Sequence, residues 1–281
     1  MNQDLHDRHI VITGANTGIG KETARALAAR GARLTLACRT EAKTRPVIDE
    51  LIKATGNERI TFIGLDLGDL AAVRACADQL VARGEPIHVL INNAGLAGPR
   101  GLTKDGFELA FGTNHLGHFL FTTRLMPLIV DNPGARIVNV ASASHYQAKG
   151  IDWDAVRQRT RSTTGMAEYA VSKLANVLFT AELARRYTPA QVCAYALHPG
   201  VIASDIWGRR MPRPLAWLIT RFMKSTADGA RTSIYCAASP AVAGVSGRYY
   251  TDEQERRPSR VATDAALAAE LWQRSVAWTQ A

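Results

Sequence analysis

Short apolar runs and longer helical patterns alternate along this chain of 281 residues, and that alternation restricts the fold more than any other feature. Six runs are rich in β-branched residues and have the length expected of buried parallel strands. They lie at 10–13, 33–37, 60–64, 87–91, 136–140 and 192–197, and a seventh is expected near 247–250. Helical patterns lie between them at about 18–30, 42–55, 69–82, 106–130 and 168–187.

Strands that alternate with helices predict an α/β fold in which helices cover both faces of one parallel sheet. We therefore expect a single-domain, Rossmann-type doubly wound sheet of about seven strands. No linker-like stretch or change in composition divides the chain, and 47% of its residues are hydrophobic, so one domain over 1–281 is predicted. Ligands of such sheets bind at the carboxyl ends of the strands, where the strand order reverses.

The four cysteines lie far apart and form no C-x-x-C pair, which argues against a zinc site or a disulfide framework. His115 and His118 are three residues apart in a helical pattern, but no third ligand accompanies them, so no metal site is predicted. The polar N-terminus lacks the apolar core of a secretory signal, and no stretch approaches the roughly 18 apolar residues of a membrane span. A cytoplasmic location is the resulting expectation.

The formal net charge is +9. Nucleic acid, anionic lipid and an anionic cofactor would all respond to such a field, so the charge alone selects none of them, and no nucleic-acid partner is predicted. Part of the excess lies at 207–224, where arginine and lysine alternate with aromatic and aliphatic residues. Two interpretations of this segment stay open: a lid over an apolar pocket and a peripheral membrane contact.

Three glycines are spaced Gly14-x-x-x-Gly18-x-Gly20 where the first strand gives way to the first helix. At such a junction Gly14 can form the tight turn, and Gly18 and Gly20 permit close approach of a ligand to the backbone. The free N–H groups and the dipole of the following helix stabilise an anion there. The spacing therefore predicts a site for the phosphates of a dinucleotide.

The end of the second strand indicates which dinucleotide is bound. NAD-preferring sheets usually place a carboxylate there for the ribose 2′-hydroxyl, roughly 20 residues after the glycines. Here the sequence is Ala37-Cys38-Arg39, with no carboxylate. Because the Arg39 guanidinium would pair with a 2′-phosphate, NADP(H) is favoured over NAD(H).

An ordered set of motifs resembles the short-chain dehydrogenase/reductase family over nearly the whole chain. It comprises TGxxxGxG at 13–20, Asp66-Leu67, NNAG at 92–95, Asn114 in "TNHLGHFL", Ser142 in "IVNVASAS" and Tyr169-x-x-x-Lys173. The resemblance implies a catalytic set of Asn114, Ser142, Tyr169 and Lys173. It also implies cofactor contacts at Gly14, Asn16, Thr17, Gly18, Ile19, Gly20, Arg39, Asp66, Leu67, Asn93, Ala94, Gly95, Tyr169, Lys173, Pro199, Gly200 and Ser204.

Finer features are similar to the retinol dehydrogenase branch, which handles lipophilic alcohols and carbonyls. These are "ACRT", "NHLGHFLFT", "HPG", "GRYYTDE" and "LWQRS". Two departures are the lack of the hydrophobic N-terminal anchor of many members and Ser204 in place of the threonine after the Pro-Gly turn. Because Ser204 keeps the hydroxyl, contact with the nicotinamide carboxamide is still expected.

The chemistry of carbonyl reduction fits the residue types. Hydride addition creates an alkoxide, which needs a proton donor and a second hydrogen bond, and Tyr169 and Ser142 supply them. Lys173 lies one helical turn after Tyr169, and its positive charge favours the tyrosinate form of a group whose pKa is ordinarily near 10. By resemblance, Lys173 also holds the nicotinamide ribose, and Asn114 supports a proton relay.

Substrate choice is expected to depend on two variable segments. The 26 residues between Ser142 and Tyr169, which include Trp153, form an insertion that could wall the pocket, and 201–226 forms a lid over a lipophilic alcohol, aldehyde or ketone. Relatives pair through helices equivalent to 106–130 and 168–187, so a homodimer is one expected assembly. A C-terminal helix is expected to pack on the core through Trp272 and Trp278.

Two other functions stay open. One is an NADPH-dependent carbon–carbon double-bond reductase of the protochlorophyllide reductase type, although the pocket cysteine expected there is missing. The other is a non-catalytic nucleotide-sensing protein, against which the complete catalytic set argues.

Overall fold

The computed structural model describes residues 4–130, 132–200 and 225–280. Their strands form one sheet with the order β3-β2-β1-β4-β5-β6-β7-β8, in which all neighbours are parallel except β7 and β8. The strands are β1 His9–Thr13, β2 Arg33–Cys38, β3 Ile60–Gly64, β4 Val89–Asn92, β5 Arg136–Val140, β6 Cys193–His198, β7 Arg248–Thr251 and β8 Gln254–Arg256. The order reverses at β1, so the carboxyl ends of β1 and β4 form the switch point.

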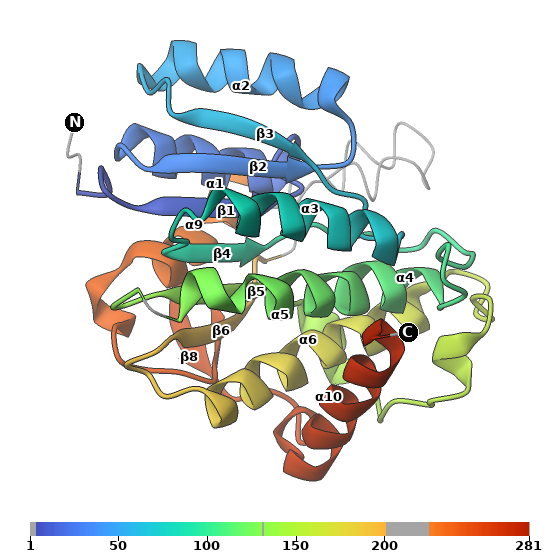
Figure 1. The fold of residues 1–281 in the computed structure, drawn as a ribbon. Coiled ribbons are helices and arrows are strands. Elements are labelled where there is room, and N and C mark those ends of the chain that lie inside the picture. Colours follow the sequence, from blue (N-terminus) through green and yellow to red (C-terminus); the bar gives the residue numbers. More distant parts are fainter. Residues whose placement is uncertain (1–3, 131, 201–224, 281) are drawn as a thin grey trace.

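Helices cover both faces of the sheet (Figure 1). One layer contains α1 Gly18–Ala29, α2 Glu41–Thr55 and α9 Thr226–Ala238, and the other contains α3 Leu70–Arg83, α5 Gly117–Ile129, α6 Met166–Arg186 and α10 Ala265–Gln280. The alternation of side chains along the strands supplies both cores, because Ile10 and Ile12 face the first layer while Val11 faces the second. The predicted fold class is confirmed.

The seven expected strands are all present, and β8 is an addition. Its three residues are exposed and polar, so no apolar pattern marks it. It pairs antiparallel with β7 through a two-residue turn in which Asp252 and Glu253 both have positive φ, as a type I′ turn requires. Because Asp-Glu is not a usual sequence for that turn, neither the turn nor the strand could be recognised in advance.

The pattern at 106–130 does not form one helix. A short helix α4, Leu109–Phe111, runs into a π-helical turn, Gly112–Leu116, before α5 begins. Gly117 lies where the helix meets the loop after β3, since a Cβ there would be 2.5 Å from the carbonyl oxygen of Leu67. The irregular turn matters for the site because it contains Asn114.

The C-terminal helix α10 packs across α5 and α6 (Figure 1). The Trp272 ring lies 5.0 Å from Phe119 of α5 and 5.8 Å from Phe179 of α6, between ring centroids. The predicted packing of this helix on the core is therefore confirmed. These apolar side chains belong to the two helices through which a homodimer was expected, and the chain's own helix covers them.

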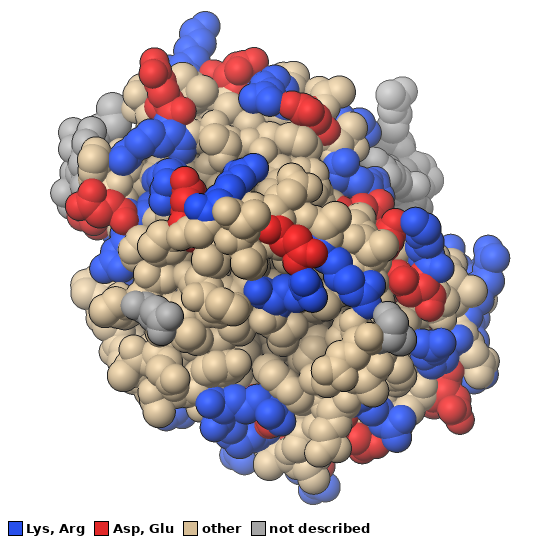
Figure 2. All heavy atoms as spheres, in the orientation of Figure 1, with Lys and Arg blue, Asp and Glu red and all other residues tan. Residues whose placement is uncertain are grey.

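The surface carries both signs of charge. Figure 2 shows lysine and arginine side chains interspersed with aspartate and glutamate on one face. Ion pairs include Lys104 with Asp69, whose nitrogen and oxygen lie 2.7 Å apart. The basic segment 207–224, most of the expected lid and Ser204 lie outside the described residues. Within the described residues, none of the helices combines the length and hydropathy of a membrane span.

Candidate active site

The glycine turn follows β1 and is packed tightly against the loop after β4. Gly14 has a φ of +66°, and a Cβ added to it would lie 2.8 Å from the Cβ of Ala94. Only glycine meets both conditions, because the backbone is left-handed and no space remains for a side chain. The turn therefore brings the predicted cofactor residues at 14 and 94 into contact.

Asn93 stabilises the glycine turn through side-chain hydrogen bonds. Its side-chain amide donates to the carbonyl oxygens of Thr13 and Gly14, at 2.8 and 3.3 Å. A Cβ on Gly20 would lie 2.4 Å from the Asn93 amide nitrogen, so the lack of a side chain at Gly20 leaves room for the Asn93 amide. Asn93 thus reaches the predicted cofactor site through its contact with the turn.

The start of α1 is suited to an anion. Thr17 precedes the helix without a side-chain capping bond, and the first turn contains no acidic residue. Gly18 has a φ of +55°, and an added Cβ would meet no atom within 4 Å, which leaves open space beside the backbone. Uncapped N–H groups, the helix dipole and this space together fit the pyrophosphate of a dinucleotide.

The other predicted cofactor residues follow neighbouring strand ends. Arg39 comes directly after β2 and is exposed. After β3, the Asp66 carboxylate accepts from the backbone N–H of Gly68 at 2.9 Å, and Leu67 is buried. Pro199 and Gly200 follow β6, and Gly200 has a φ of +94°. The set therefore spreads along the carboxyl edge of the sheet from β3 to β6.

Ser142 and Tyr169 meet beside this edge. Ser142 follows β5, and its oxygen accepts from the Ser144 N–H at 3.1 Å as the cap of a 3₁₀ turn. Burial raises the pKa of the Tyr169 phenol, and a hydrogen bond with the Ser142 side chain opposes that rise. In the chain by itself the phenol is therefore protonated at neutral pH, which contrasts with the expected shift toward tyrosinate.

Lys173 lies one turn after Tyr169 on α6, with its side chain only 3% exposed. Its Nζ donates to the carbonyl oxygen of Val140 at 2.8 Å and lies 5.6 Å from the centroid of the Tyr169 ring. Burial lowers the pKa of the ammonium to about 8. One of its three N–H groups is used by Val140, so the others are available to a ligand or to the tyrosine.

Three hydrogen bonds hold the side chain of Asn114. Its oxygen accepts from the Leu96 N–H at 2.9 Å, and its nitrogen donates to the Leu96 carbonyl at 3.0 Å and to Ser172 Oγ at 2.9 Å. Ser172 in turn donates to the carbonyl oxygen of Tyr169 at 2.7 Å. Both amide hydrogens are therefore used, and the side chain can offer a further group only the second lone pair of its oxygen.

A buried polar ladder beneath the site was missed by sequence reasoning. The Asn92 amide donates to Asn139 Oδ1 and to Thr122 Oγ1, both at 2.8 Å. Asn139 donates to Thr180 Oγ1 at 2.9 Å. The ladder joins β4 and β5 to α5 and α6, so it fixes the helix with Tyr169 relative to the strand before Ser142. The only sequence signal is two asparagines at the ends of otherwise apolar strands.

His145 is a second residue that sequence reasoning missed. Its Nδ1 lies 2.6 Å from the carbonyl oxygen of Ser142, and its Nε2 lies 3.1 Å from the backbone nitrogen of Ser259. The carbonyl only accepts and the N–H only donates, so Nδ1 carries the proton and Nε2 is bare. The ring thereby connects the backbone of Ser142 to the loop after β8.

The insertion between Ser142 and Tyr169 packs toward α10. Trp153 lies 6.2 Å from Trp278, between ring centroids, and the Arg274 guanidinium lies 4.8 Å from the centre of the Trp153 ring. Glu108 accepts from Thr160 Oγ1 and from the Phe111 N–H, which ties the insertion to the start of α4. Trp153 thus anchors the insertion on the C-terminal helix.

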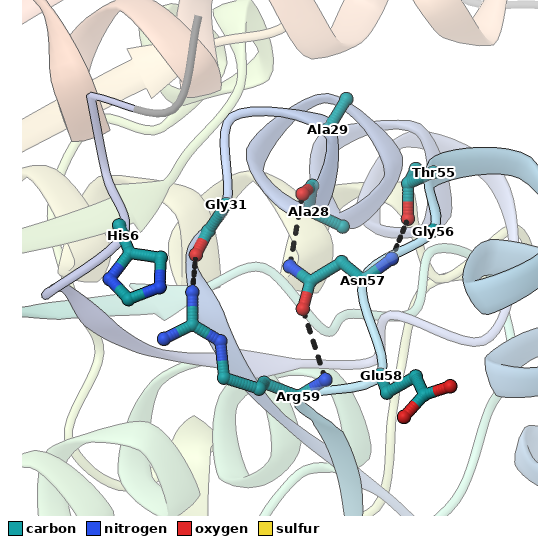
Figure 3. Close-up of a pocket in the computed structure, with 9 residues that line it drawn as sticks. All are labelled: His6, Ala28, Ala29, Gly31, Thr55, Gly56, Asn57, Glu58 and Arg59. Carbon is teal, nitrogen blue, oxygen red and sulfur yellow. Dashed lines mark hydrogen bonds between the residues drawn. The ribbon is translucent and has the colours of Figure 1, made fainter. Parts of the chain in front are cut away.

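A separate surface hollow of about 430 Å³ lies far from these residues (Figure 3). It is lined by residues before β2 and β3, at the amino ends of the strands. The Asn57 amide donates to the carbonyl oxygens of Ala28 and Ala32, at 3.0 and 2.8 Å. Asn57 therefore satisfies one carbonyl in the last turn of α1 and one directly before β2, and the hollow includes none of the predicted site residues.

A Rossmann-type sheet that gathers a glycine turn, a serine, a tyrosine and a buried lysine at its carboxyl edge defines an oxidoreductase. Residues 8–153 match the family model of the short chain dehydrogenases. Retinol dehydrogenase 12 of Mus musculus is 42% identical over 273 residues, which cover 96% of this chain and 86% of that protein. The chain therefore belongs to the short-chain dehydrogenase family and, within it, to the branch of the retinol dehydrogenases.

Solved structures share the fold of this chain. A crystal structure of a Mycobacterium paratuberculosis protein has a TM-score of 0.79 and 36% identity, and covers 100% of this chain and 97% of its own. A short chain dehydrogenase from Shigella flexneri, complexed with NADP, has the same fold, with a TM-score of 0.71 and 23% identity over 90% of this chain and 100% of its own. The predicted family and branch are confirmed.

Proposed function

We propose that this chain is an NADP(H)-dependent oxidoreductase that interconverts a lipophilic alcohol and its aldehyde or ketone, with Tyr169 as general acid and base. The observation that carries the proposal is the close approach of the Ser142 hydroxyl to the Tyr169 phenol, near enough to lower the pKa of the phenol against the rise that burial causes, with Lys173 one helical turn away. A carbonyl oxygen placed between the two hydroxyls would receive one hydrogen bond from each. This is the arrangement that stabilises a developing alkoxide.

The residues divide the chemistry among them. In the reductive direction Tyr169 donates its proton to the substrate oxygen while Ser142 holds that oxygen by a hydrogen bond. Bound NADPH would supply the hydride. In the oxidative direction Tyr169 must first lose its proton, and the ammonium of Lys173 favours that loss because opposite charges attract. Burial opposes it, so the balance between the two decides how well the tyrosine serves as a base.

The choice of NADP(H) rests on Arg39. The residue is exposed directly after β2, where the second strand borders the glycine turn, and Gly14 N donates to the Ala37 carbonyl at 2.9 Å. A guanidinium at that position would bind a 2′-phosphate by charge-assisted hydrogen bonds. The start of α1 would hold the pyrophosphate, Asp66 and Leu67 the adenine, and Lys173 the nicotinamide ribose.

The substrate class follows from the relatives. The similar proteins of mouse and human are retinol dehydrogenases, and retinol is a long, apolar primary alcohol. We therefore assign this chain a lipophilic alcohol or carbonyl as its substrate class.

The test is a screen of NADPH oxidation over retinoid, steroid, fatty and aromatic carbonyls, repeated with NADH. Tyr169→Phe should lower kcat by about a thousandfold or more while NADPH affinity stays within about threefold, because only the transferable proton is removed. Tyr187→Phe, at the residue that directly follows the same helix, is the matched control and should keep full activity. Turnover of small polar sugars alone would contradict the substrate class, and NADPH binding without turnover would indicate a nucleotide-sensing protein.

A further inference from the structure

The inner side of α5 carries a histidine that touches both halves of the site. His118 is buried, and its Nδ1 lies 2.9 Å from the backbone carbonyl oxygen of Asn114. Its Nε2 lies 2.8 Å from Thr13 Oγ1, at the end of β1. One ring therefore spans the gap between the π-helical turn and the strand that leads into the glycine turn.

Hydrogen-bond accounting fixes the protonation state of this ring. The carbonyl of Asn114 can only accept, so Nδ1 carries the hydrogen, and Nε2 must accept from the Thr13 hydroxyl if the ring is neutral. Thr13 Oγ1 also accepts from the backbone N–H groups of Asn93 and Ala94, both at 2.9 Å. The one proton and both lone pairs of the threonine are then used. Burial keeps the ring neutral by lowering the pKa of His118 to about 4.

Further hydrogen bonds connect Asn114 to α6, the helix that contains Tyr169. Asn114 donates through its side chain to Ser172, and Ser172 donates to the carbonyl of Tyr169. On the other side of the His118 ring, Thr13 Oγ1 accepts from the backbone N–H groups of Asn93 and Ala94, which belong to the loop that packs on Gly14. Two sets of hydrogen bonds, joined by the covalent frame of Asn114, therefore connect the cofactor turn through His118 to the backbone of Tyr169.

We propose that His118 is a positioning residue, held as the Nδ1–H tautomer, that sets the placement of Asn114 and Tyr169 relative to the cofactor turn. The proposal rests on the proposed function for its effect on turnover, whereas its effect on the cofactor turn is measurable by binding alone. The charged and titratable groups around the His118 ring favour its neutral form. Lys173 faces the ring from α6 and disfavours the imidazolium, and neutral His115 is the other titratable group nearby on the same segment.

Three substitutions at His118 separate the role of the Nδ1 hydrogen bond to Asn114 from that of the Nε2 hydrogen bond to Thr13. His118→Phe keeps the ring volume and removes both hydrogen bonds, so kcat should fall by about tenfold to a hundredfold and NADPH affinity by about tenfold. His118→Asn places an amide hydrogen near Nδ1, so it should recover most of kcat. His118→Gln reaches toward Thr13 with an oxygen, so it should recover most of the cofactor affinity.

The matched control is His115→Leu. His115 is equally buried three residues earlier, but its Nε2 pairs with Ser275 of α10 at 3.0 Å and touches none of the site. His115→Leu should lower thermal stability while kcat and NADPH affinity stay within about twofold. If His118→Phe behaved as His115→Leu does, the ring would have a packing role only and the proposal would be overturned.

Two further measurements keep the test informative if His118→Phe folds poorly. The ¹⁵N shifts of the imidazole in the wild-type protein should show a protonated Nδ1 and a bare Nε2, and the opposite tautomer would overturn the proposal. Thr13→Val combined with His118→Asn should weaken NADPH binding by no more than Thr13→Val alone, because both remove the hydrogen bond between Thr13 and position 118. If no carbonyl were turned over, the binding and ¹⁵N results would still decide this inference, and only the proposed function would fail.

Discussion

The ammonium nitrogen of Lys173 lies 2.8 Å from the carbonyl oxygen of Val140, the last residue of β5. Ser142 follows two residues later, so this bond joins the helix with the tyrosine to the strand with the serine. The site therefore contains a buried cation that contributes little to the stability of the surrounding fold. A buried charge with one neutral partner costs stability, and enzymes commonly accept such a cost at their sites.

Lys173→Met should therefore abolish turnover and stabilise the protein without cofactor. Methionine fills nearly the same volume, and Val140 retains a hydrogen bond from the Asn176 amide at 3.3 Å. We expect the free energy of unfolding near pH 7 to rise by about 1–3 kcal/mol, measured by urea denaturation. A loss of stability of that size would contradict the account.

The pH dependence of stability should change in the same variant. The pKa of Lys173 is about 8 in the folded chain against an ordinary value of 10.5, so the unfolded chain binds more protons between these values. Wild-type stability contains a contribution that increases as pH rises from about 8 to about 10.5. Lys173→Met should lack that increase. Parallel curves for the two proteins over this range would rule it out.

Gly14→Ala should damage both stability and cofactor binding. The added methyl group would lie 2.8 Å from the Ala94 Cβ in a left-handed backbone. Gly56→Ala is the matched control, because Gly56 has a φ of +70° at the end of α2 and open space around it. The control should cost about 1 kcal/mol from backbone strain alone, whereas Gly14→Ala should cost about 1–3 kcal/mol more and weaken NADPH binding. Equal costs would remove the case for close packing at the turn.

Arg39→Asp should reverse the cofactor preference. Losing the guanidinium should raise the Kd of NADPH by about tenfold to a hundredfold, while the carboxylate can accept from the 2′-hydroxyl of NADH. Lys43→Asp makes the same change of charge at an exposed position on α2 and controls for the long-range field. Titration with both cofactors measures the result. An equal effect of the two variants would indicate that Arg39 acts only through the general field.

Trp278→Ala should loosen the insertion before Tyr169. The Trp278 ring contacts Phe107 at 5.4 Å and Trp153 at 6.2 Å between centroids, so its removal takes from both their aromatic contact with α10 and leaves Trp153 the Arg274 guanidinium. We expect a loss of about 2–4 kcal/mol in stability and faster hydrogen exchange over 148–164. Trp272→Ala should cost a similar amount of stability but leave exchange over 148–164 unchanged, because Trp272 packs on Phe119 and Phe179. Equal exchange in both variants would show that Trp278 does not anchor the insertion.

The alternation of apolar runs was enough to predict seven strands of the sheet, most of its helices and the carboxyl edge where the candidate site lies, because each buried strand must be apolar along its length. The glycine spacing and the Tyr169 to Lys173 interval placed the candidate site in the same way. The features that could not be predicted depend on partners distant in sequence. His118 pairs with Thr13 across 105 residues, and Asn92 pairs with Asn139 across 47. No local pattern distinguishes such side chains from other polar residues.

Helix α9 and the π-helical turn were missed for a different reason. The sequence of α9, Thr226–Ala238, contains glycine, serine and few large apolar residues, so its periodicity is weak, and its packing on α1 decides its form. The π-helical turn packs on α6 and is bonded to α10 through His115 and Ser275. Tertiary packing therefore overrides local propensity in both places.

The bond between His115 and Ser275 also has a consequence for how the molecule is made. These two residues are 160 positions apart, so the ribosome synthesises His115 long before its partner on α10. At ordinary translation speeds of about 5–20 residues per second, His115 waits on the order of ten seconds for that partner. During this interval the apolar rings of α5 and α6 are uncovered, and they form a surface on which nascent chains can associate or chaperones can bind.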